Sequence, residues 1–373
     1  MPILKDLVSR IFASAGIKIN GPEPWDIQVK NPSFYSRVLR QGSLGLGEAY
    51  MDGWWDVEDL EGFFFRVIDS GLAKKARFDP VTILGFLVAV FSNQQKPSKA
   101  FEIGEKHYDV GNDLYSLMLD RLMTYSCGYF KNAQNLDEAQ EAKLDLICRK
   151  LRLKAGERVL DIGGGWGSFA RYAAENYGVN VDVITVSKEQ FELGKKLCAN
   201  LPVAFYLQDY RDLGRNGKYN KIVSVGMIEH VGYKNYREYF EIAKQALLPE
   251  GLFLLHTIGG QKSVRSGDPW IEKYIFTNSM LPSKNQLKRA CQGIFKIHDW
   301  HEFGAYYHPT IMAWFSNFNR YWPRLEEKYG KRFYRMWKYY LLSCAASFRA
   351  GKNQVWQILL SDPELNEEYE TLR

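Results

Sequence analysis

Residues 158–174 read RVLDIGGGWGSFARYAA, and this stretch decides the fold. A run of β-branched and apolar residues ends in Asp161, a glycine-rich loop follows, and an apolar-periodic segment comes next. The first part predicts a buried strand and the last part predicts a helix. A glycine-rich turn between a strand and a helix is typical of a nucleotide cradle, because it lets the backbone approach the ligand closely.

Two kinds of ligand compete for this loop. A dinucleotide fingerprint needs G-x-G-x-x-G, but the sixth position here is Ser168. Asp182 lies at the start of the next predicted strand, whereas a ribose-binding acid would lie at its end. The D-x-G-x-G-x-G form instead resembles the first motif of S-adenosylmethionine-dependent methyltransferases, so S-adenosylmethionine is favoured and a dinucleotide is the alternative. The candidate ligand-binding residues of the loop are Asp161, Gly163, Gly165 and Gly167.

The centre of the chain alternates predicted strands with predicted helices. This rhythm predicts an α/β fold with a doubly wound, Rossmann-like parallel sheet that binds ligands at the carboxyl ends of its strands. The predicted strands are 158–161, 181–186, 203–207, 221–225 and 251–257, with late candidates at 294–300 and 355–360. Polar residues at the ends of the second and third strands are further candidates for binding the cofactor: Thr185, Gln190, Gln208 and Asp209.

Residues 1–95 predict a smaller, mainly helical domain that contacts lipid, and 96–373 a catalytic domain with helical insertions. The first residues place apolar side chains at helical spacing instead of forming a signal peptide. The stretch NQQKPSKA (93–100) is typical of a linker. The apolar run 81–91, flanked by basic residues, is too short to cross a bilayer and predicts either an interfacial helix or a buried one.

Composition limits the partners. The chain has 373 residues, a formal net charge of +6 and 15% aromatic residues. This mild positive charge suits an anionic membrane surface better than nucleic acid, which would require concentrated Lys and Arg. The five cysteines are widely spaced with no C-x-x-C, which argues against disulfides and indicates a reducing cytoplasm. His298 and His301 form an H-x-x-H pair, but no further ligands complete a metal site nearby.

Eight stretches occur in the order in which they occur in cyclopropane-fatty-acyl-phospholipid synthases, and the chain resembles that family over nearly its whole length. They include EKHYDVGNDLY (105–115), MTYSCGYF (123–130), SVGMIEHVG (224–232), FLLHTIGG (253–260), DWHEFGAYY (299–307) and YYLLSCAASFRA (339–350). GSLGLGEAYMDGWWD (42–56) is similar to the N-terminal part of the bacterial phospholipid enzymes. The resemblance implies methylene transfer from S-adenosylmethionine to a cis double bond of an unsaturated phospholipid acyl chain. It also implies peripheral contact with the inner membrane face, and family members are commonly homodimers.

This chemistry passes through carbocation character, so it requires a dry pocket, electron-rich rings and a base. The resemblance implies that the base is a bound bicarbonate, held by side chains and by backbone amides. Because two bare anions repel each other, a shared proton or an imidazolium at His256 must accompany Glu229 and the ion. The residues that the resemblance assigns to the ion are Glu229, His256, Tyr307, Cys127 and Ile258, and Cys344 matches a family cysteine. Those assigned to the cofactor's carboxylate end and its lid are Tyr125, Ser126, His107, Tyr108 and Asn112.

Simpler roles for these residues, and two other functions for the chain, are alternatives to the assignments above. Glu229 could only orient the cofactor, and a lone histidine on an apolar strand such as His256 is more often a satisfied core residue. An amine N-methyltransferase on the same scaffold would use both side chains on an amine, with no bicarbonate. A lipid-binding protein that senses the cofactor without turnover is a third hypothesis.

Overall fold

The computed structural model describes residues 2–72, 110–215, 219–264, 267–277, 279–365 and 368–373. The chain forms two compact units, each built from three stretches. Unit 1 comprises Met1–Leu114, Gly267–Thr277 and Trp314–Lys352, and unit 2 comprises Tyr115–Ser266, Asn278–Ala313 and Asn353–Arg373. The boundary at residue 95, the apolar run 81–91, the linker 93–100, His107 and Tyr108 lie outside the described residues, and the domain boundary stays a prediction.

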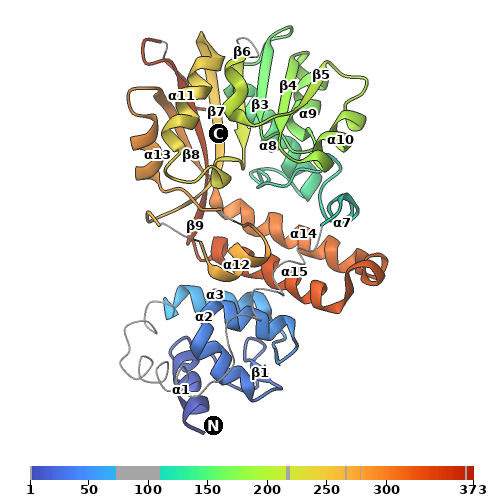
Figure 1. Ribbon diagram of the computed structural model, residues 1–373, viewed down its shortest axis with the longest axis vertical. Coiled ribbons are helices and arrows are strands. Elements are labelled where there is room, and N and C mark those ends of the chain that lie inside the picture. The colour runs from blue at the N-terminus through green and yellow to red at the C-terminus, as the bar shows by residue number, and fades with distance from the viewer. Residues whose placement is uncertain (1, 73–109, 216–218, 265–266, 278, 366–367) are drawn as a thin grey trace. The chain divides into compact units, whose positions relative to one another are not determined.

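Unit 2 contains a seven-stranded sheet in the order β5-β4-β3-β6-β7-β9-β8, counted over the described residues (Figure 1). The first five strands of this order run parallel, whereas β9 is antiparallel to both β7 and β8. All seven predicted strands are confirmed, and so is the predicted α/β class. Their bounds are β3 Arg158–Ile162, β4 Asn180–Thr185, β5 Val203–Leu207, β6 Tyr219–Val225, β7 Leu247–Gly260, β8 Lys296–Glu302 and β9 Asn353–Ser361.

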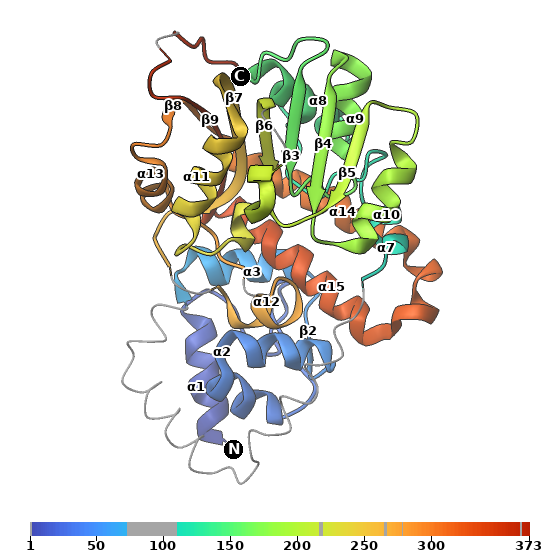
Figure 2. The same ribbon diagram turned by 45° about the horizontal axis from the view of Figure 1, so that its top comes forward.

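Helices cover both faces of this sheet (Figures 1 and 2). On one face α8, α9 and α10 bury residues such as Val159 and Leu254, and on the other α11 and α13 bury Leu160 and Phe253. Burial on both faces explains why these parallel strands read as continuous apolar runs. The helices of this unit are α8 Leu136–Lys150, α9 Ser168–Tyr177, α10 Lys188–Leu197, α11 Tyr236–Ala246 and α13 Lys284–Cys291.

The strand order places a topological switch point between β3 and β6. The chain proceeds from β3 outward to β4 and β5, then returns to β6 on the other side of β3. Loops that leave the carboxyl ends of β3 and β6 therefore diverge and open a crevice between them, which is where doubly wound sheets bind their ligands. The glycine loop follows β3, and the Glu229 segment follows β6 as a short 3-10 helix, Ile228–His230.

Unit 1 is mainly helical, with one two-stranded ribbon formed by β1 and β2. The predicted helix at the N-terminus is confirmed as α1, and α2 and α15 are broken by Gly42 and Gly330, whose φ angles are +55° and +73°. The elements are α1 Pro2–Ala13, β1 Gln28–Val29, α2 Ser33–Met51, β2 Trp55–Asp56, α3 Leu60–Asp69, α12 Pro269–Tyr274 and α15 Glu326–Arg349. Helices α7 Asn112–Met118 and α14 Tyr307–Tyr321 contain residues of both units.

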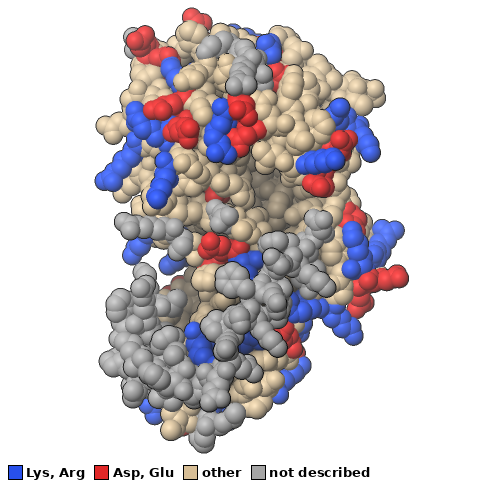
Figure 3. Space-filling view, viewed as in Figure 1, with Lys and Arg blue, Asp and Glu red and all other residues tan. Residues whose placement is uncertain are grey.

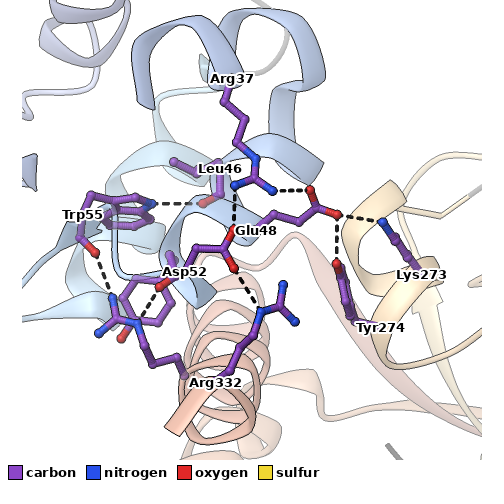
Figure 4. Close-up of polar contacts among 10 residues, drawn as sticks. Arg37, Leu46, Glu48, Asp52, Trp55, Lys273, Tyr274 and Arg332 are labelled. Atoms are coloured by element: carbon purple, nitrogen blue, oxygen red, sulfur yellow. Dashed lines mark hydrogen bonds and ion pairs between the residues drawn. The ribbon is translucent and has the colours of Figure 1, made fainter. Parts of the chain in front are cut away.

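An ionic network joins the three stretches of unit 1 (Figure 4). Glu48 of α2 accepts hydrogen bonds from Arg37 (2.7 Å), Lys273 (2.7 Å) and Tyr274 (2.8 Å). Asp52 binds Arg37 (2.7 Å) and Arg332 of α15 (3.0 Å). The first stretch of this unit therefore depends on side chains that lie more than 220 residues later in the chain.

In the upper part of Figure 3, Lys and Arg side chains of the described residues are interspersed with Asp and Glu. Among the described residues, no helix combines the length and the apolar character needed to cross a membrane.

Candidate active site

The glycine loop has the backbone shape that only glycine adopts easily. Gly163, Gly165 and Gly167 have φ angles of +74°, +58° and +81°. A Cβ atom on Gly163 would lie 2.7 Å from Cγ of Met227, so space as well as backbone conformation requires glycine there. The amides of Gly163 and Gly164 donate to the carbonyl of Ile184 (2.9 and 3.2 Å), which ties the loop to β4.

Asp161, the residue before the last of β3, is buried with an unpaired carboxylate oxygen. The residue is 1% exposed, and its Oδ2 atom has no hydrogen-bond partner. Burial raises the pKa of Asp161 to about 7, although nearby Lys143 favours the charged form. A buried acceptor without a donor, beside a backbone cradle, fits a ligand that brings an N–H or O–H group, as S-adenosylmethionine does.

The predicted residues at the ends of β4 and β5 lie at the same edge of the sheet. Thr185 donates to Gln190 Oε1 (3.0 Å), and the amide of Gln208 donates to the Thr185 carbonyl (2.9 Å). Asp209 already accepts two hydrogen bonds from Arg211 (both 2.8 Å), and this guanidinium lowers the pKa of the carboxyl. The carboxylate of Asp209 must therefore share or exchange that partner before it can bind adenine.

Val186 is a candidate that the sequence analysis missed. It follows Thr185 directly and is 74% exposed, which is unusual for a valine. An apolar side chain left uncovered at the ligand-binding edge suits the flat face of a base. The only signal in the sequence was its position one residue beyond the polar strand end.

Tyr125 and Ser126 approach the glycine loop from the segment that precedes α8. The ring of Tyr115 lies 5.1 Å from that of Tyr125 and 4.9 Å from that of Trp166, which stands inside the loop. Ser126 accepts a hydrogen bond from Lys143 (2.8 Å). Asn112 belongs to unit 1, so it is not placed with this group.

Glu229 is the central acid of the second half of the site. Its Oε1 atom accepts from the Ile258 amide of β7 (2.7 Å), while Oε2 is buried without a partner. Burial raises the pKa of Glu229 to about 7, against the opposing effect of the Ile258 amide. This carboxyl therefore holds or releases a proton near neutral pH, unlike an exposed glutamate.

His256 lies two residues before Ile258 on the same strand. Its Nδ1 atom is 3.4 Å from Nε2 of Gln357, its register partner on β9, and its ring centroid is 5.7 Å from that of Phe303. Burial, reinforced by the Lys143 and Lys150 ammonium groups, lowers the pKa of His256 well below its usual range. Burial therefore favours the neutral imidazole of His256 at pH 7.

The segment of Cys127 is bound to the first turn of α14, the helix that begins at Tyr307. The Gly128 amide donates to Thr310 Oγ1 (3.1 Å), and this hydroxyl donates to the carbonyl of Tyr306 (2.7 Å). Tyr307 is buried at the first position of α14. Phe303, whose ring contacts that of His256, lies 6.3 Å from the ring of Tyr306 and connects this corner to β7.

The two cysteines assigned by resemblance differ in position. Cys127 is buried in unit 2, and burial raises the pKa of its thiol. Cys344 lies on α15 in unit 1, where burial raises its pKa to about 12. Both sulfurs are thiols at neutral pH, so neither has the character of a nucleophile.

Lys143 and Lys150 are further residues that the sequence analysis missed. Both are fully buried on α8, and burial lowers the pKa of each to about 8. Lys150 forms an ion pair with Asp299 (3.2 Å) and contacts Nδ1 of His301 (3.1 Å). The signal was their spacing: they share the i, i+4 and i+7 face with the buried Leu144 and Ile147.

The H-x-x-H histidines do not act as a pair. Nε2 of His298 lies 2.7 Å from the hydroxyl of Ser361, whereas His301 contacts Lys150. No group of three His, Cys, Asp or Glu residues suited to a metal ion occurs among the residues that the structure describes.

Sequence comparisons show which known proteins this chain is similar to. The family model described as "Mycolic acid cyclopropane synthetase" matches residues 95–358. The chain is 50% identical over 355 residues to the cyclopropane-fatty-acyl-phospholipid synthase of Escherichia coli strain K12, covering 95% of this chain and 92% of that protein. It is 33% identical over 362 residues to a probable fatty acid methyltransferase of Pseudomonas putida, covering 92% and 89%.

Several solved structures are also similar to this chain. The cyclopropane synthase MmaA2 of Mycobacterium tuberculosis is 30% identical with a TM-score of 0.65, covering 72% of this chain and all of that one. The mycolic acid cyclopropane synthase CmaA1, solved with SAH and CTAB, is 30% identical with a TM-score of 0.63, covering 72% and 99%. Coclaurine N-methyltransferase is 19% identical with a TM-score of 0.67, covering 85% and 99%, and this likeness shows the fold alone.

Proposed function

The chain belongs to the mycolic acid cyclopropane synthetase family and is an S-adenosylmethionine-dependent methyltransferase, and from this we propose its reaction. It transfers a methylene group to a cis double bond of unsaturated acyl chains in membrane phospholipids and closes a cyclopropane ring. The observation that carries the proposal is the buried group of Glu229, Ile258 and His256 beside the switch point, in a chain half identical to a cyclopropane-fatty-acyl-phospholipid synthase.

The cofactor end of the site would be formed by the loop after β3 and the ends of β4 and β5. S-adenosylmethionine, when bound, supplies an electrophilic methyl group on a sulfonium sulfur. Asp161 and the amides of the glycine loop would hold its methionine part, and Thr185, Gln190, Gln208 and Asp209 its ribose and adenine. Tyr125 and Ser126 would close over the carboxylate end.

The acyl end needs surroundings that tolerate positive charge and exclude water. Tyr129 stands edge-on to Phe303 (5.4 Å) and Tyr306 (5.3 Å), and the ring of Phe303 lies 5.7 Å from that of His256. Electron-rich ring faces stabilise a cation most strongly where water is absent. We therefore assign these rings to the carbocation-like state that an attacking alkene must pass through.

The last proton must leave the transferred carbon for the ring to close. Glu229 and His256, with Tyr307 and the backbone at Cys127 and Ile258, would hold a bicarbonate whose contribution is a base. The unpaired Oε2 of Glu229 fits this assignment, because it can accept the ion's proton. The Ile258 amide already donates to Glu229, so the ion would have to share it.

Phospholipid as the substrate implies contact with a bilayer. We assign the protein to the cytoplasm and to the periphery of the inner membrane face, acting as a homodimer as its family members commonly do. The net charge of +6 suits an anionic surface. On α1, Ile3 is 78% exposed, which offers an apolar side chain to lipid.

Lipid mass analysis tests this function. Vesicles of phospholipid with cis-unsaturated chains are incubated with the protein and labelled S-adenosylmethionine, with fully saturated vesicles as the control. We expect a gain of one CH₂ with loss of the double bond, and no product from the saturated vesicles. Methylated amines with unchanged lipid would indicate an amine N-methyltransferase instead.

A bicarbonate-depleted assay tests the base separately. The rate should fall on depletion and recover when bicarbonate is added back. A rate that is indifferent to bicarbonate would remove the ion from the mechanism and leave the lipid reaction standing.

A further inference from the structure

Lys143 places an ammonium group where a helix normally buries a hydrocarbon. The side chain is fully buried on the inner face of α8, and its Nζ atom donates to the hydroxyl of Ser126 (2.8 Å). Removing a lysine from water costs several kcal/mol unless charges and hydrogen bonds compensate. A chain that keeps a cation at this position therefore has a compensating set of partners, and those partners lie in the candidate site.

The first partners belong to the segment 124–129, which crosses the beginning of α8. Gln140, one turn before Lys143, donates to the Ser126 carbonyl (2.7 Å), and the Tyr129 amide donates to the Ala139 carbonyl (2.8 Å). At Gly128 the segment is also held by Thr310 (3.1 Å). Among these contacts, the hydrogen bond from Lys143 is the one that holds the hydroxyl of Ser126.

The second partners are acidic. Burial lowers the pKa of Lys143 to about 8, and the carboxylates of Asp120 and Asp161 oppose that change. Asp120 accepts from the amides of Leu122 (2.9 Å) and Thr124 (2.7 Å), so it orders the approach to Ser126. Asp161 belongs to the cofactor loop, and its Oδ2 atom has no hydrogen-bond partner. One buried cation thus donates a hydrogen bond to Ser126 and interacts electrostatically with Asp161 of the cofactor loop.

We propose that Lys143 is a positioning residue for methyl transfer: its buried ammonium holds Ser126, and with it the Cys127 backbone, against α8 and faces the Asp161 carboxylate of the cofactor loop. It touches neither reacting atoms nor solvent. Its effect reaches the cofactor through Ser126 and Asp161, so loss of the ammonium disturbs cofactor binding before it disturbs the fold.

The test compares two buried lysines of the same helix. Lys143→Met removes the ammonium under Ser126, and Lys150→Met removes an equally buried one whose partners are Asp299 and His301. S-adenosylhomocysteine binding is measured by calorimetry between pH 6 and pH 9, with the melting temperature recorded for each variant. We expect roughly tenfold weaker binding for Lys143→Met, or about 1.4 kcal/mol, because the charged hydrogen bond that fixes Ser126 is lost. Lys150→Met should lower the melting temperature but bind normally.

The pH profile separates positioning from bulk stability. Wild-type affinity should rise as Asp161 ionises near pH 7 and fall as Lys143 loses its proton above about pH 8. In Lys143→Met the upper limb should be missing and the rise should move to higher pH, because Asp161 has lost its cation. If both lysine variants bind S-adenosylhomocysteine equally, with the wild-type profile, Lys143 is structural only and the proposal is wrong.

Ser126→Ala covers the case in which Lys143→Met folds poorly, because it should itself weaken S-adenosylhomocysteine binding, and where both variants fold a double-mutant cycle tests whether Lys143 acts through Ser126. Ser126→Ala removes only the acceptor, and the double variant should bind no more weakly than Lys143→Met alone, because the two residues act as one unit. Additive losses would show that Lys143 does not act through Ser126. The effect on turnover, about 100-fold in kcat/KM for a misplaced site, rests on the proposed function. The binding measurements do not rest on the proposed function. Absence of a cyclopropane product would therefore overturn the proposed function, whereas the role of Lys143 would still be decided by S-adenosylhomocysteine binding.

Discussion

Replacing Glu229 by glutamine should stabilise the protein at pH 8 while it removes activity. Burial raises the pKa of Glu229 from its ordinary value of 4.5 to about 7. Because the folded-state pKa lies above the unfolded-state pKa, the folded protein binds more protons between these values. Its stability therefore falls as the pH rises from about 4.5 to about 7. Glutamine has the same shape and never ionises, so the variant escapes this loss.

The size of the effect follows from the same two values. A difference of about 2.5 pKa units at 1.36 kcal/mol each is roughly 3 kcal/mol, fully present at pH 8. At pH 5 about 1 kcal/mol of it has developed. The amide oxygen of glutamine can still accept from Ile258, but it is a weaker acceptor than a carboxylate, which offsets about 1 kcal/mol. The net gain at pH 8 is therefore roughly 2 kcal/mol, or about 4–8 °C in Tm for a domain of 150–250 residues.

The assay is thermal unfolding of wild type and Glu229→Gln at pH 5 and pH 8, with Glu238→Gln, an exposed change on neighbouring α11, as the matched control. The control should change stability by less than about 0.5 kcal/mol at both pH values. Lipid turnover by Glu229→Gln should fall at least about 100-fold, the usual contribution of a proton-transfer group. A variant less stable than wild type at pH 8, or equally shifted at both pH values, would refute the assignment of Glu229 as a carboxyl strained by burial.

Three further outcomes are expected. Gly163→Ala should weaken S-adenosylhomocysteine binding by about tenfold or more, because its φ is +74° and the new Cβ meets Met227; an unchanged Kd in calorimetry would mean that the loop is not the cradle. Arg211→Ala should leave the melting temperature nearly unchanged, since the ion pair is exposed, and should tighten binding severalfold by releasing Asp209; weaker binding would remove Asp209 from the adenine site. Glu48→Gln should destabilise unit 1 by about 2–3 kcal/mol at pH 7, measured by urea unfolding and limited proteolysis. Against the effect of burial, hydrogen bonds led by that of Lys273 lower the pKa of Glu48, so this loss should shrink as the pH falls below the ordinary glutamate pKa of 4.5, and a constant loss would contradict the ion-pair account.

The strands of the sheet could be predicted from the sequence because each is specified by residues that are adjacent in the chain. Each strand is a short apolar run bounded by turn residues, and the predicted bounds lie within four residues of the observed ones, with β7 extending furthest at Leu247–Gly260. The polar strand ends were predictable for the same reason, since parallel strands deliver their carboxyl ends to one edge. Glu229, His256 and Ile258 needed the family resemblance, because only the register of β6 and β7 shows that the Glu229 carboxylate reaches the Ile258 amide.

Other features depend on contacts between distant residues. The helical spacing of Lys143 and Lys150 places them on the buried face of α8, but the partners that accommodate their ammonium groups lie in residues 120–161 and 299–301 and had no local signal. Asp209 and Arg211 are close in the sequence, but the residue types alone do not show whether the Asp209 carboxylate binds Arg211 or a ligand. The grouping of Gly267–Thr277 and Trp314–Lys352 with the N-terminal residues had no local signal either.

The interleaving of the two units has a consequence for synthesis on the ribosome. Helices α2 and α3 emerge early, but their packing partners on α12 and α15 are translated some 200 residues later. Until then Glu48 lacks Lys273, and Asp52 lacks Arg332. An N-terminal domain usually folds before the rest of the chain is synthesised, but unit 1 cannot complete its folding in this order. The apolar surface of nascent unit 1 must therefore stay uncovered until α15 has been made, and a gene cut at residues 93–100 would divide unit 1 while leaving all three stretches of unit 2 in one piece.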